Sequence, residues 1–204
     1  MDERARVLRE SDLADDPLQQ FSRWFADAEA AGIRAPHAMA LATSTRDAAP
    51  SVRMVLLKGF DERGFVFFTG YVSRKSAELD GNPRAALLFY WDPLGRQVRI
   101  EGGVERVIDA ESDDYFATRP RGAQLAAAAS RQSAVLSGRE ELDARVAVLE
   151  REHAGKDVTR PDHWGGYRLL PETYEFWQHR EDRLHDRLRY RRADGGWAVE
   201  RLSP

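Results

Sequence analysis

The chain of 204 residues contains no cysteine. This absence excludes disulfide bridges, cysteine-ligated zinc and thiol nucleophiles, and it favours a protein of a reducing compartment. The chain also lacks a strong excess of positive or negative charge. Its formal net charge is -3 at pH 7, and no run of like charges forms a nucleic-acid-binding tail. No apolar run reaches the length of a membrane span, and the charged N-terminus does not resemble a signal peptide. We therefore expect a cytoplasmic protein that binds neither nucleic acid nor membranes.

Lysine is scarce, although arginine is not. Of the 31 basic residues only Lys58, Lys75 and Lys156 are lysines. A lysine ammonium is a compact charge that binds phosphate well and is not interchangeable with a planar guanidinium. Lys58 and Lys75 lie in segments with further signs of anion binding, so both are candidate phosphate ligands.

Several widespread catalytic motifs are missing as well. The chain has neither the Gly-x-Gly-x-x-Gly turn of Rossmann folds nor a Gly-Lys-Ser/Thr phosphate loop. Its five histidines lack the spacing of a metal motif such as His-Glu-x-x-His. We predict no metal site.

The stretch 51–59 is an apolar strand that carries two cations. Val, Leu and Met between Pro50 and Gly59 predict a buried strand. Because side chains alternate along a strand, Arg53 and Lys58 are predicted to face opposite sides and to serve two different anions. The alternative is that both lie at the strand ends with their charged groups in water.

A second candidate anion site follows at Ser73. This residue is predicted to cap a short helix whose first turn carries Arg74 and Lys75. Cations at that position oppose the helix dipole, so the arrangement predicts an anion, here phosphate, at the helix N-terminus. A solvated basic turn is the alternative.

Three further polar groups are candidates for ligand binding. The amide of Gln97 can donate and accept at the edge of a heteroaromatic ring, unless it is a surface residue of an edge strand. Tyr115 and Arg119 are four residues apart on a predicted helix, so both can donate to one phosphate or form a surface pair. The polar cluster 130–133 follows an alanine-rich segment and is predicted at a binding surface.

The C-terminal segment 183–188 is predicted to be a strand with three potentially cationic side chains on one face. Arg183, His185 and Arg187 alternate along it, which implies that an anionic or electron-rich group lies over them. Leu184 and Leu188 on the opposite face predict one buried side.

The remaining pattern predicts a mainly β fold with α insertions. Asp16 and Pro17 begin a helix, and strands are expected at 38–43, 51–58, 65–69, 85–91, 96–108, 164–170, 173–177, 183–188 and 197–202. The pair 164–170 and 173–177 is predicted to fold around Pro171. Many short strands in hairpins predict an antiparallel barrel. We predict a mobile N-terminal arm over residues 1–16 and a single domain over residues 17–204.

Several motifs resemble the pyridoxamine 5'-phosphate oxidase family. They are residues 53–59 (RMVLLKG), 73–75 (SRK), 96–102 (RQVRIEG), 164–168 (WGGYR), 175–178 (EFWQ) and the tail 183–187 (RLHDR). The resemblance is collinear from about residue 17 to residue 204. It implies an FMN-binding split β-barrel, antiparallel and Greek-key-like, and a homodimer with two sites at its interface.

The same resemblance implies the activity of a pyridoxal 5'-phosphate synthase of vitamin B6 biosynthesis and salvage. Such an oxidoreductase uses FMN to oxidise pyridoxamine or pyridoxine 5'-phosphate to pyridoxal 5'-phosphate and reduces O2 to H2O2. FMN would contact Arg53, Met54, Val55, Leu56, Leu57, Lys58, Phe68, Thr69, Arg74, Lys75 and Gln97. The partner subunit would supply Gln132, Ser133, Trp177 and Arg187.

The resemblance also implies a substrate site. Lys58, Tyr115 and Arg119 would hold the substrate phosphate, and Arg183 and His185 would be catalytic residues against the pyridine ring. The chain departs from the family at Ala123, where a serine often helps to hold that phosphate. It also has no tyrosine before Pro17, where some relatives have a lid.

Two alternatives stay open from the sequence. One is a phenazine-biosynthesis type FMN oxidase, against which Lys58 argues because a lysine there suits a phosphorylated substrate. The other is a non-catalytic carrier or sensor that binds FMN or pyridoxal phosphate. The sequence also leaves open the preference between the amine and the alcohol substrate and the presence of an allosteric site for the product.

Overall fold

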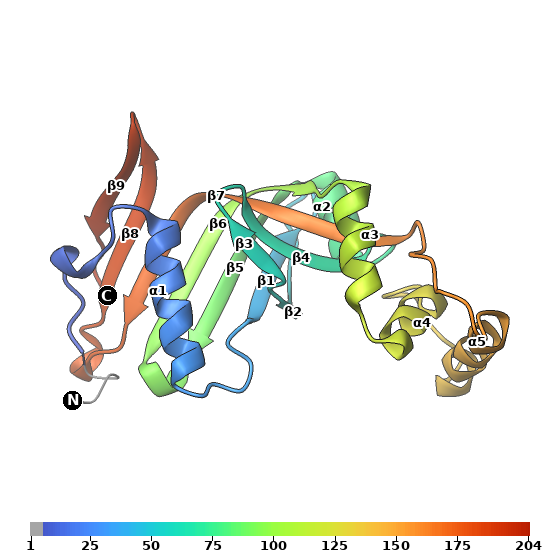
Figure 1. Ribbon diagram of the computed structural model, residues 1–204. Coiled ribbons are helices and arrows are strands. Elements are labelled where there is room, and N and C mark those ends of the chain that lie inside the picture. Colours follow the sequence, from blue (N-terminus) through green and yellow to red (C-terminus); the bar gives the residue numbers. More distant parts are fainter. Residues whose placement is uncertain (1–5) are drawn as a thin grey trace.

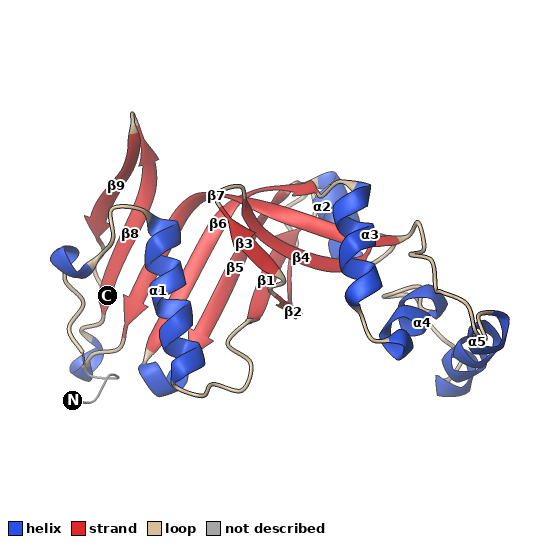
Figure 2. Ribbon diagram, in the orientation of Figure 1, coloured by secondary structure: helices blue, strands red, loops and turns tan. Residues whose placement is uncertain are grey.

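The computed structural model describes residues 6–204 as one curved sheet with helices on one face and at one end (Figures 1 and 2). The strands are β1 (Ala38–Ser44), β2 (Pro50–Leu56), β3 (Gly59–Asp61), β4 (Gly64–Gly70), β5 (Arg84–Trp91), β6 (Arg96–Arg106), β7 (Trp164–Gln178), β8 (Asp186–Ala193) and β9 (Gly196–Arg201). The α-helices are α1 (Pro17–Ala30), α2 (Arg74–Gly81), α3 (Asp109–Thr118), α4 (Arg121–Ala129) and α5 (Arg139–Glu152). Short 3-10 helices are η2 (Glu10–Asp12), η3 (Asp92–Leu94) and η4 (Glu181–Arg183).

All strand pairs in the sheet are antiparallel, in the order β2-β1-β5-β6-β7-β4-β3, with β8 on β7 and β9 on β8. The N-terminal part of β7 pairs with β4 and its C-terminal part with β8, while β6 pairs along both parts. The sheet therefore divides at β7 and curls, as Figure 2 shows. The predicted antiparallel, mainly β fold with α insertions is confirmed.

Helix α1 covers one face of the sheet and closes the core. It begins as predicted, with Pro17 in its first turn and the Asp16 carboxylate accepting a hydrogen bond from the Gln19 amide at 3.0 Å. Its apolar stripe includes the buried Phe21 and Trp24, which pack edge-on against aromatic rings of β4, β5 and β7. Burial of each such side chain stabilises the fold by roughly 1.5–3 kcal/mol.

Strand β2 differs from its prediction. It lies at an end of the strand order and pairs with β1, and its even positions are exposed: Val52 is 69% and Met54 64% exposed. The predicted alternation is correct, but the predicted buried strand is wrong for the single chain. An apolar sequence predicts burial of a strand, but it does not indicate whether the same chain or another molecule covers that strand.

Strand β7 is continuous, so the predicted pair of strands around Pro171 is wrong. Pro171 lies opposite Gly102, where the register between β6 and β7 shifts. A Cβ atom on Gly102 would stand 1.9 Å from the Leu170 carbonyl oxygen, so the chains approach this closely only because residue 102 is glycine. The irregularity tolerates the proline, and the strand runs on.

The prediction of a strand over 183–188 is wrong for its first half. Residues 181–183 form η4, in which Asp182 and Arg183 have φ values of 55° and 61°. Strand β8 begins only at Asp186, and Leu184 is 68% exposed. Arg183 and His185 therefore lie in the connection between β7 and β8, with Arg183 at the end of η4, and among the three cations Arg187 alone lies on the strand.

Residues 8–14, within the predicted arm, contact the C-terminal strands. The Leu8 amide donates to an Asp186 carboxylate oxygen at 3.1 Å, and the Tyr190 hydroxyl donates to the Ala14 carbonyl at 2.6 Å. Residues 1–5 lie outside the described residues, so the mobility of the arm and the division at residue 16 stay predictions. Among residues 6–204 no helix is long and apolar enough to cross a membrane.

Candidate functional site

A cavity of about 1020 Å³ lies between β2, β4 and the helices α2 to α4. Pockets of this size accommodate cofactors and drug-sized ligands. It collects most of the predicted site: Arg53, Met54, Val55, Leu56, Lys58, Phe68, Thr69, Arg74, Lys75, Tyr115, Arg119, Gln132 and Ser133 line it. Leu57 is not among the lining residues and is buried in the core.

One end of the cavity is a cationic cluster at the start of α2. Ser73 caps this helix as predicted, and the Lys75 ammonium donates to the Thr69 hydroxyl and the Gln132 amide oxygen, both at 3.0 Å. Burial, together with repulsion by Arg53, lowers the pKa of Lys75 to about 8. The ammonium is thus charged at neutral pH but poorly hydrated, which favours an anionic ligand.

Gln132 and Ser133 belong to this cluster within the same chain. The Gln132 amide oxygen also accepts from the Gly70 amide at 3.2 Å, and the Ser133 hydroxyl accepts from the Arg74 amide at 3.2 Å. The segment after α4 folds back onto the start of α2 to make these contacts. The prediction that the partner subunit supplies these two residues is therefore corrected, because they complete the cluster of their own chain.

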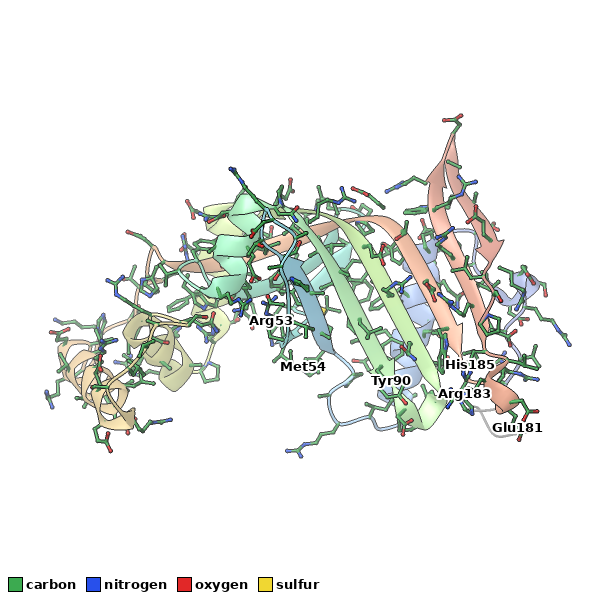
Figure 3. The ribbon with its side chains drawn as sticks, turned by 180° about the vertical axis from the view of Figure 1, so that it is seen from behind. Arg53, Met54, Tyr90, Glu181, Arg183 and His185 are labelled. Carbon is green, nitrogen blue, oxygen red and sulfur yellow. The ribbon has the colours of Figure 1, made fainter. Side chains whose placement is uncertain are left out.

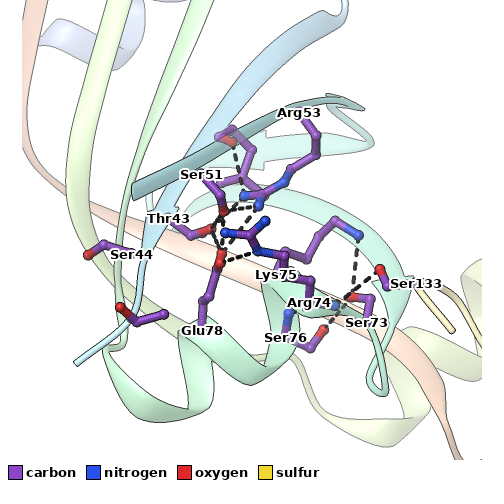
Figure 4. Close-up of polar contacts among 12 residues, drawn as sticks. Thr43, Ser44, Ser51, Arg53, Ser73, Arg74, Lys75, Ser76, Glu78 and Ser133 are labelled. Carbon is purple, nitrogen blue, oxygen red and sulfur yellow. Dashed lines mark hydrogen bonds and ion pairs between the residues drawn. The ribbon is translucent and has the colours of Figure 1, made fainter. Parts of the chain in front are cut away.

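A residue that the sequence analysis missed, Glu78, lies behind the cations (Figure 4). Its carboxylate accepts from Thr43 at 2.5 Å, Ser51 at 2.6 Å, Arg53 at 3.2 Å and Arg74 at 2.8 Å. Burial opposes its ionisation, but these hydrogen bonds outweigh burial and lower the pKa of Glu78 to about 2. The spacing of four residues between Arg74 and Glu78 on a helix was the available signal.

A second group of cationic side chains, Lys58 and Arg119, also lines the cavity. The Arg119 guanidinium packs over the Trp164 ring at 4.6 Å, and its Nη1 is buried with no hydrogen-bond partner among the described residues. Burial lowers the pKa of Arg119. The Lys58 ammonium lies 5.8 Å from the centre of the Tyr115 ring. A buried guanidinium nitrogen without a partner fits a bound anion.

An aromatic wall and an alanine wall complete the cavity. Phe68 stacks on Tyr115 with ring centres 4.1 Å apart and on Trp164 at 5.5 Å. Helix α4 contributes Ala123 and two further alanines to the lining. These walls suit the flat face of an aromatic ligand.

The remaining predicted residues lie outside this cavity, on the open face of the sheet. Gln97 pairs with Trp177 across β6 and β7, and Trp177 pairs with Arg187 across β7 and β8. Gln97 thus lies on an interior strand, and the edge-strand alternative does not hold. The buried Glu175 carboxylate accepts from the Arg187 Nε at 2.7 Å and from Arg99 at 2.5 Å, which orients the Arg187 side chain.

Arg183 and His185 lie beside this row in the loop before β8. The Arg180 amide donates to the His185 Nδ1 at 3.2 Å, so a neutral ring carries its proton on Nε2. The ring lies 4.5 Å from that of Trp177. Burial, His179 and Arg183 lower the pKa of His185, which favours the neutral form. Within residues 6–204 no group of three His, Cys, Asp or Glu side chains could hold a metal ion.

The two regions are far apart within one chain. Figure 3 shows Arg53 and Met54 on β2 well separated along the sheet from Arg183 and His185, with Tyr90 between them. This open face carries exposed apolar side chains, among them Met54 at 64% and Tyr90 at 56% exposure. Large exposed apolar side chains gathered on one face favour an interaction site there.

The chain matches two family models. A model described as pyridoxamine 5'-phosphate oxidase matches residues 25–151. A second, described as the pyridoxine 5'-phosphate oxidase C-terminal dimerisation region, matches residues 164–204.

Curated relatives carry a consistent name. Pyridoxine/pyridoxamine 5'-phosphate oxidase of Rubrobacter xylanophilus is 59% identical over 97% of this chain and 91% of the relative. The proteins of the same name from Bordetella pertussis and Thermosynechococcus vestitus are 56% and 55% identical, over 97% and 100% of this chain and 94% and 96% of their own lengths.

Solved structures agree on the fold. PhzG from Burkholderia lata, solved in complex with tetrahydrophenazine-1-carboxylic acid, superposes with a TM-score of 0.92 and 37% identity over 98% of this chain and 100% of that chain. A pyridoxamine 5'-phosphate oxidase-related, FMN-binding protein of Nostoc punctiforme has a TM-score of 0.73 at 16% identity, over 94% and 100% of the two chains, and shows the fold alone. The predicted split-barrel fold is confirmed, and the chain belongs to the pyridoxamine 5'-phosphate oxidase family.

Proposed function

We propose that this protein is an FMN-dependent oxidase that converts pyridoxamine and pyridoxine 5'-phosphate to pyridoxal 5'-phosphate, with O2 reduced to H2O2. The observation that carries the proposal is the presence of two groups of cationic side chains in one cavity. The cluster at α2 contains Arg74 and Lys75, and the second contains Lys58 and Arg119, whose Nη1 is buried and has no hydrogen-bond partner among the described residues. Two sites fit one phosphate on the cofactor and one on the substrate.

The cofactor phosphate belongs at the α2 cluster in this proposal. Arg53, Arg74 and Lys75 supply the positive charge there, and Gln132 and Ser133 close the site. The desolvated Lys75 ammonium supports this assignment, since phosphate replaces the hydration that burial removes. Phe68 and β2 would line the body of the flavin.

The substrate phosphate belongs at Lys58, Tyr115 and Arg119. A phosphate there would satisfy the buried Arg119 Nη1 and lie close to the Lys58 charge. This placement assigns Arg53 and Lys58 to different phosphates, as the alternation along their strand predicts. Ala123 offers no hydrogen bond at this site.

Two chains are needed to complete each site. We assign Trp177 and Arg187, as the resemblance implies, to the flavin of the partner chain in a homodimer, and Arg183 and His185 to the substrate of that chain. Gln97, which was not among the residues expected from a partner, pairs with Trp177 and joins them in this proposal. Three observations support this: the two regions of one chain are separated, the face between them exposes apolar side chains, and residues 164–204 match a dimerisation region. We therefore propose FMN at the interface and a single split-barrel domain over residues 17–204 of each chain.

The protein's contribution to the reaction is placement of charge and hydrogen bonds. When bound, the flavin supplies the two-electron oxidation of the substrate's amine- or alcohol-bearing carbon and passes the electrons to O2. Arg183 offers a fixed positive charge, and the neutral His185 offers the Nε2 proton as a hydrogen-bond donor to the substrate ring. The phosphate ligands Lys58 and Arg119 fix the other end of the substrate, which limits its orientations.

An absorption experiment tests the proposal. We expect the purified, desalted protein to show a flavin band, and anaerobic addition of pyridoxamine 5'-phosphate to bleach it. A protein that cannot be reconstituted with FMN would refute the cofactor assignment. A flavin band that persists with substrate would favour a carrier or sensor.

The second candidate is a phenazine-type FMN oxidase, which the similarity to PhzG favours. The alanine wall of α4 would accept an apolar tricyclic ligand. A reduced phenazine carboxylate added anaerobically to the same protein should leave the flavin band unchanged if pyridoxamine 5'-phosphate is the substrate. Bleaching by the phenazine alone would favour this second function.

A further inference from the structure

We propose that Glu78 is a positioning residue that orients Arg53 and Arg74 for the phosphate of the cofactor. The inference rests on the proposed function, because it assumes that a phosphate binds at the start of α2. Glu78 itself is buried, with 3% of its side chain exposed, and it is not among the residues that line the cavity. It can act on a ligand only through the cations that it contacts.

The hydrogen bond between Glu78 and Arg74 leaves the two terminal nitrogens of Arg74 available to bind a ligand. Glu78 Oε1 accepts from the Arg74 Nε at 2.8 Å, one helical turn away. The two terminal nitrogens of Arg74 have no protein partner in the part of the chain that the structure describes. They form the pair of donors that binds phosphate bidentately, and 64% of the side chain is exposed.

Arg53 is held more completely. Its Nη1 donates to the Leu41 carbonyl at 3.2 Å and to the Thr43 hydroxyl, and its Nη2 donates to Ser51 and to Glu78. These contacts use the four terminal N–H groups and leave only the Nε–H for a ligand. Thr43 and Ser51 donate in turn to Glu78 Oε2, so the carboxylate is the common acceptor of the network (Figure 4).

The charges of the site make it possible to distinguish orientation of the cations by Glu78 from electrostatic attraction of the phosphate. Arg53, Arg74 and Lys75 carry three positive charges, and Glu78 carries one negative charge, which leaves two positive charges for a phosphate monoester of about -2. Removal of the Glu78 charge raises the positive charge of the site. Attraction alone therefore predicts tighter FMN binding, whereas loss of orientation predicts weaker binding.

The test compares FMN with riboflavin, which lacks the phosphate. The dissociation constants of both are measured by flavin fluorescence on the full-length protein freed of flavin, for the wild type, Glu78→Ala and Glu78→Gln. Glu78→Gln preserves shape but offers one acceptor oxygen and a donor in place of the carboxylate. Asp80→Asn is the matched control, because Asp80 is an exposed carboxylate of the same helix that pairs with Arg106.

We expect FMN binding to weaken about tenfold or more in Glu78→Gln, the order expected for one charge-assisted hydrogen bond, and further in Glu78→Ala. Riboflavin binding and the effect of Asp80→Asn should stay within about twofold. Equal weakening for both ligands would show a structural role and overturn the inference. Unchanged or tighter FMN binding would overturn it too.

Two further measurements distinguish a failure of the proposed Glu78 role from a failure of the proposed FMN site. If Glu78 acts through Arg74, Arg74→Ala should cost less FMN affinity in the Glu78→Ala background than in the wild type, and additive losses would contradict the inference. A wild-type protein that binds FMN no better than riboflavin would instead contradict the proposed cofactor site. That failure is visible before any Glu78 variant is measured.

Discussion

The phosphate region and the ring region of this molecule are built in different ways. In the phosphate region, residues from β1, β2, β4, α2 and the segment after α4 form a hydrogen-bonded network around Lys75 and Glu78 within one chain. In the ring region, Gln97, Trp177 and Arg187 lie on an open sheet face, and Arg183 and His185 belong to a loop with left-handed residues. The phosphate region thus forms its network within one chain, whereas the ring region is left uncovered on the sheet face of the single chain.

Phosphate binding and orientation of the reacting ring make different demands on the protein. Phosphate groups are recognised by charge and by several donors, which a single chain supplies at a helix N-terminus. The reacting ring needs groups on both of its faces, and one face of one sheet cannot supply them. In our proposal the second copy provides the missing face, so phosphate binding and ring orientation depend on different chains.

Loss of either ring residue should produce the largest effect. We expect Arg183→Ala and His185→Ala to lower kcat by about 10²- to 10⁴-fold, because each removes a group that contacts the reacting ring. FMN affinity should stay close to that of the wild type. Leu184→Ala is the control, since Leu184 lies between them and is 68% exposed. Flavin loss in the two active-site variants would give these residues a cofactor role and weaken the comparison.

Substitutions in the substrate-phosphate site should change KM rather than kcat. Lys58→Ala or Arg119→Ala should raise KM for pyridoxamine 5'-phosphate about 10- to 100-fold, since each removes a charge-assisted contact. The matched control is the substrate pyridoxamine, which has no phosphate and should react equally with wild type and variants. Equal losses for both substrates would place the phosphate elsewhere.

The α2 cluster should bind FMN in a pH-dependent way. With a pKa of about 8 in the free protein, Lys75 is charged below that pH and neutral above it. A phosphate prefers the charged form, so FMN affinity should fall above pH 8, by up to about tenfold per pH unit. Riboflavin should show no such step, and Lys75→Arg should move the FMN step to higher pH. A pH-independent FMN affinity would contradict the role of Lys75.

The smallest effect concerns Ala123. Ala123→Ser restores a hydroxyl to the wall of the cavity and should lower KM for the phosphorylated substrate several-fold, in line with about 1 kcal/mol for a hydrogen bond. Ala126→Ser, one turn along the same helix, is the comparison variant. A larger gain from Ala126→Ser would move the substrate phosphate along α4.

Local signals predicted much of the fold. The Asp16-Pro17 pair located the start of α1 and Ser73 that of α2, because a cap depends on adjacent residues. The continuity of β7 was missed because tolerance of Pro171 depends on the distant Gly102. The exposure of β2 was missed because the sequence of an apolar strand does not indicate which chain covers it.

The candidate site divides in the same way. Residue types and spacing singled out Lys58, Lys75 and Arg119, and the structure brings them to one cavity. Glu78 escaped notice because a buried carboxylate is distinguished by its partners, which lie on other strands. The assignment of Gln132 to a partner chain was wrong for a related reason: the fold-back of its segment onto Lys75 leaves no pattern in the sequence.

Mixed dimers show whether each site combines the phosphate region of one chain with the ring region of another. Arg119→Ala and His185→Ala chains, each expected to be strongly impaired at substrate concentrations below the wild-type KM, are co-expressed with different tags, and the heterodimers are purified and assayed at such a concentration. Shared sites predict one intact site and one doubly altered site per heterodimer, hence about half of the wild-type activity. Heterodimers with only the mean activity of the two parents would contradict the claim, because each site would then draw both residues from the same chain.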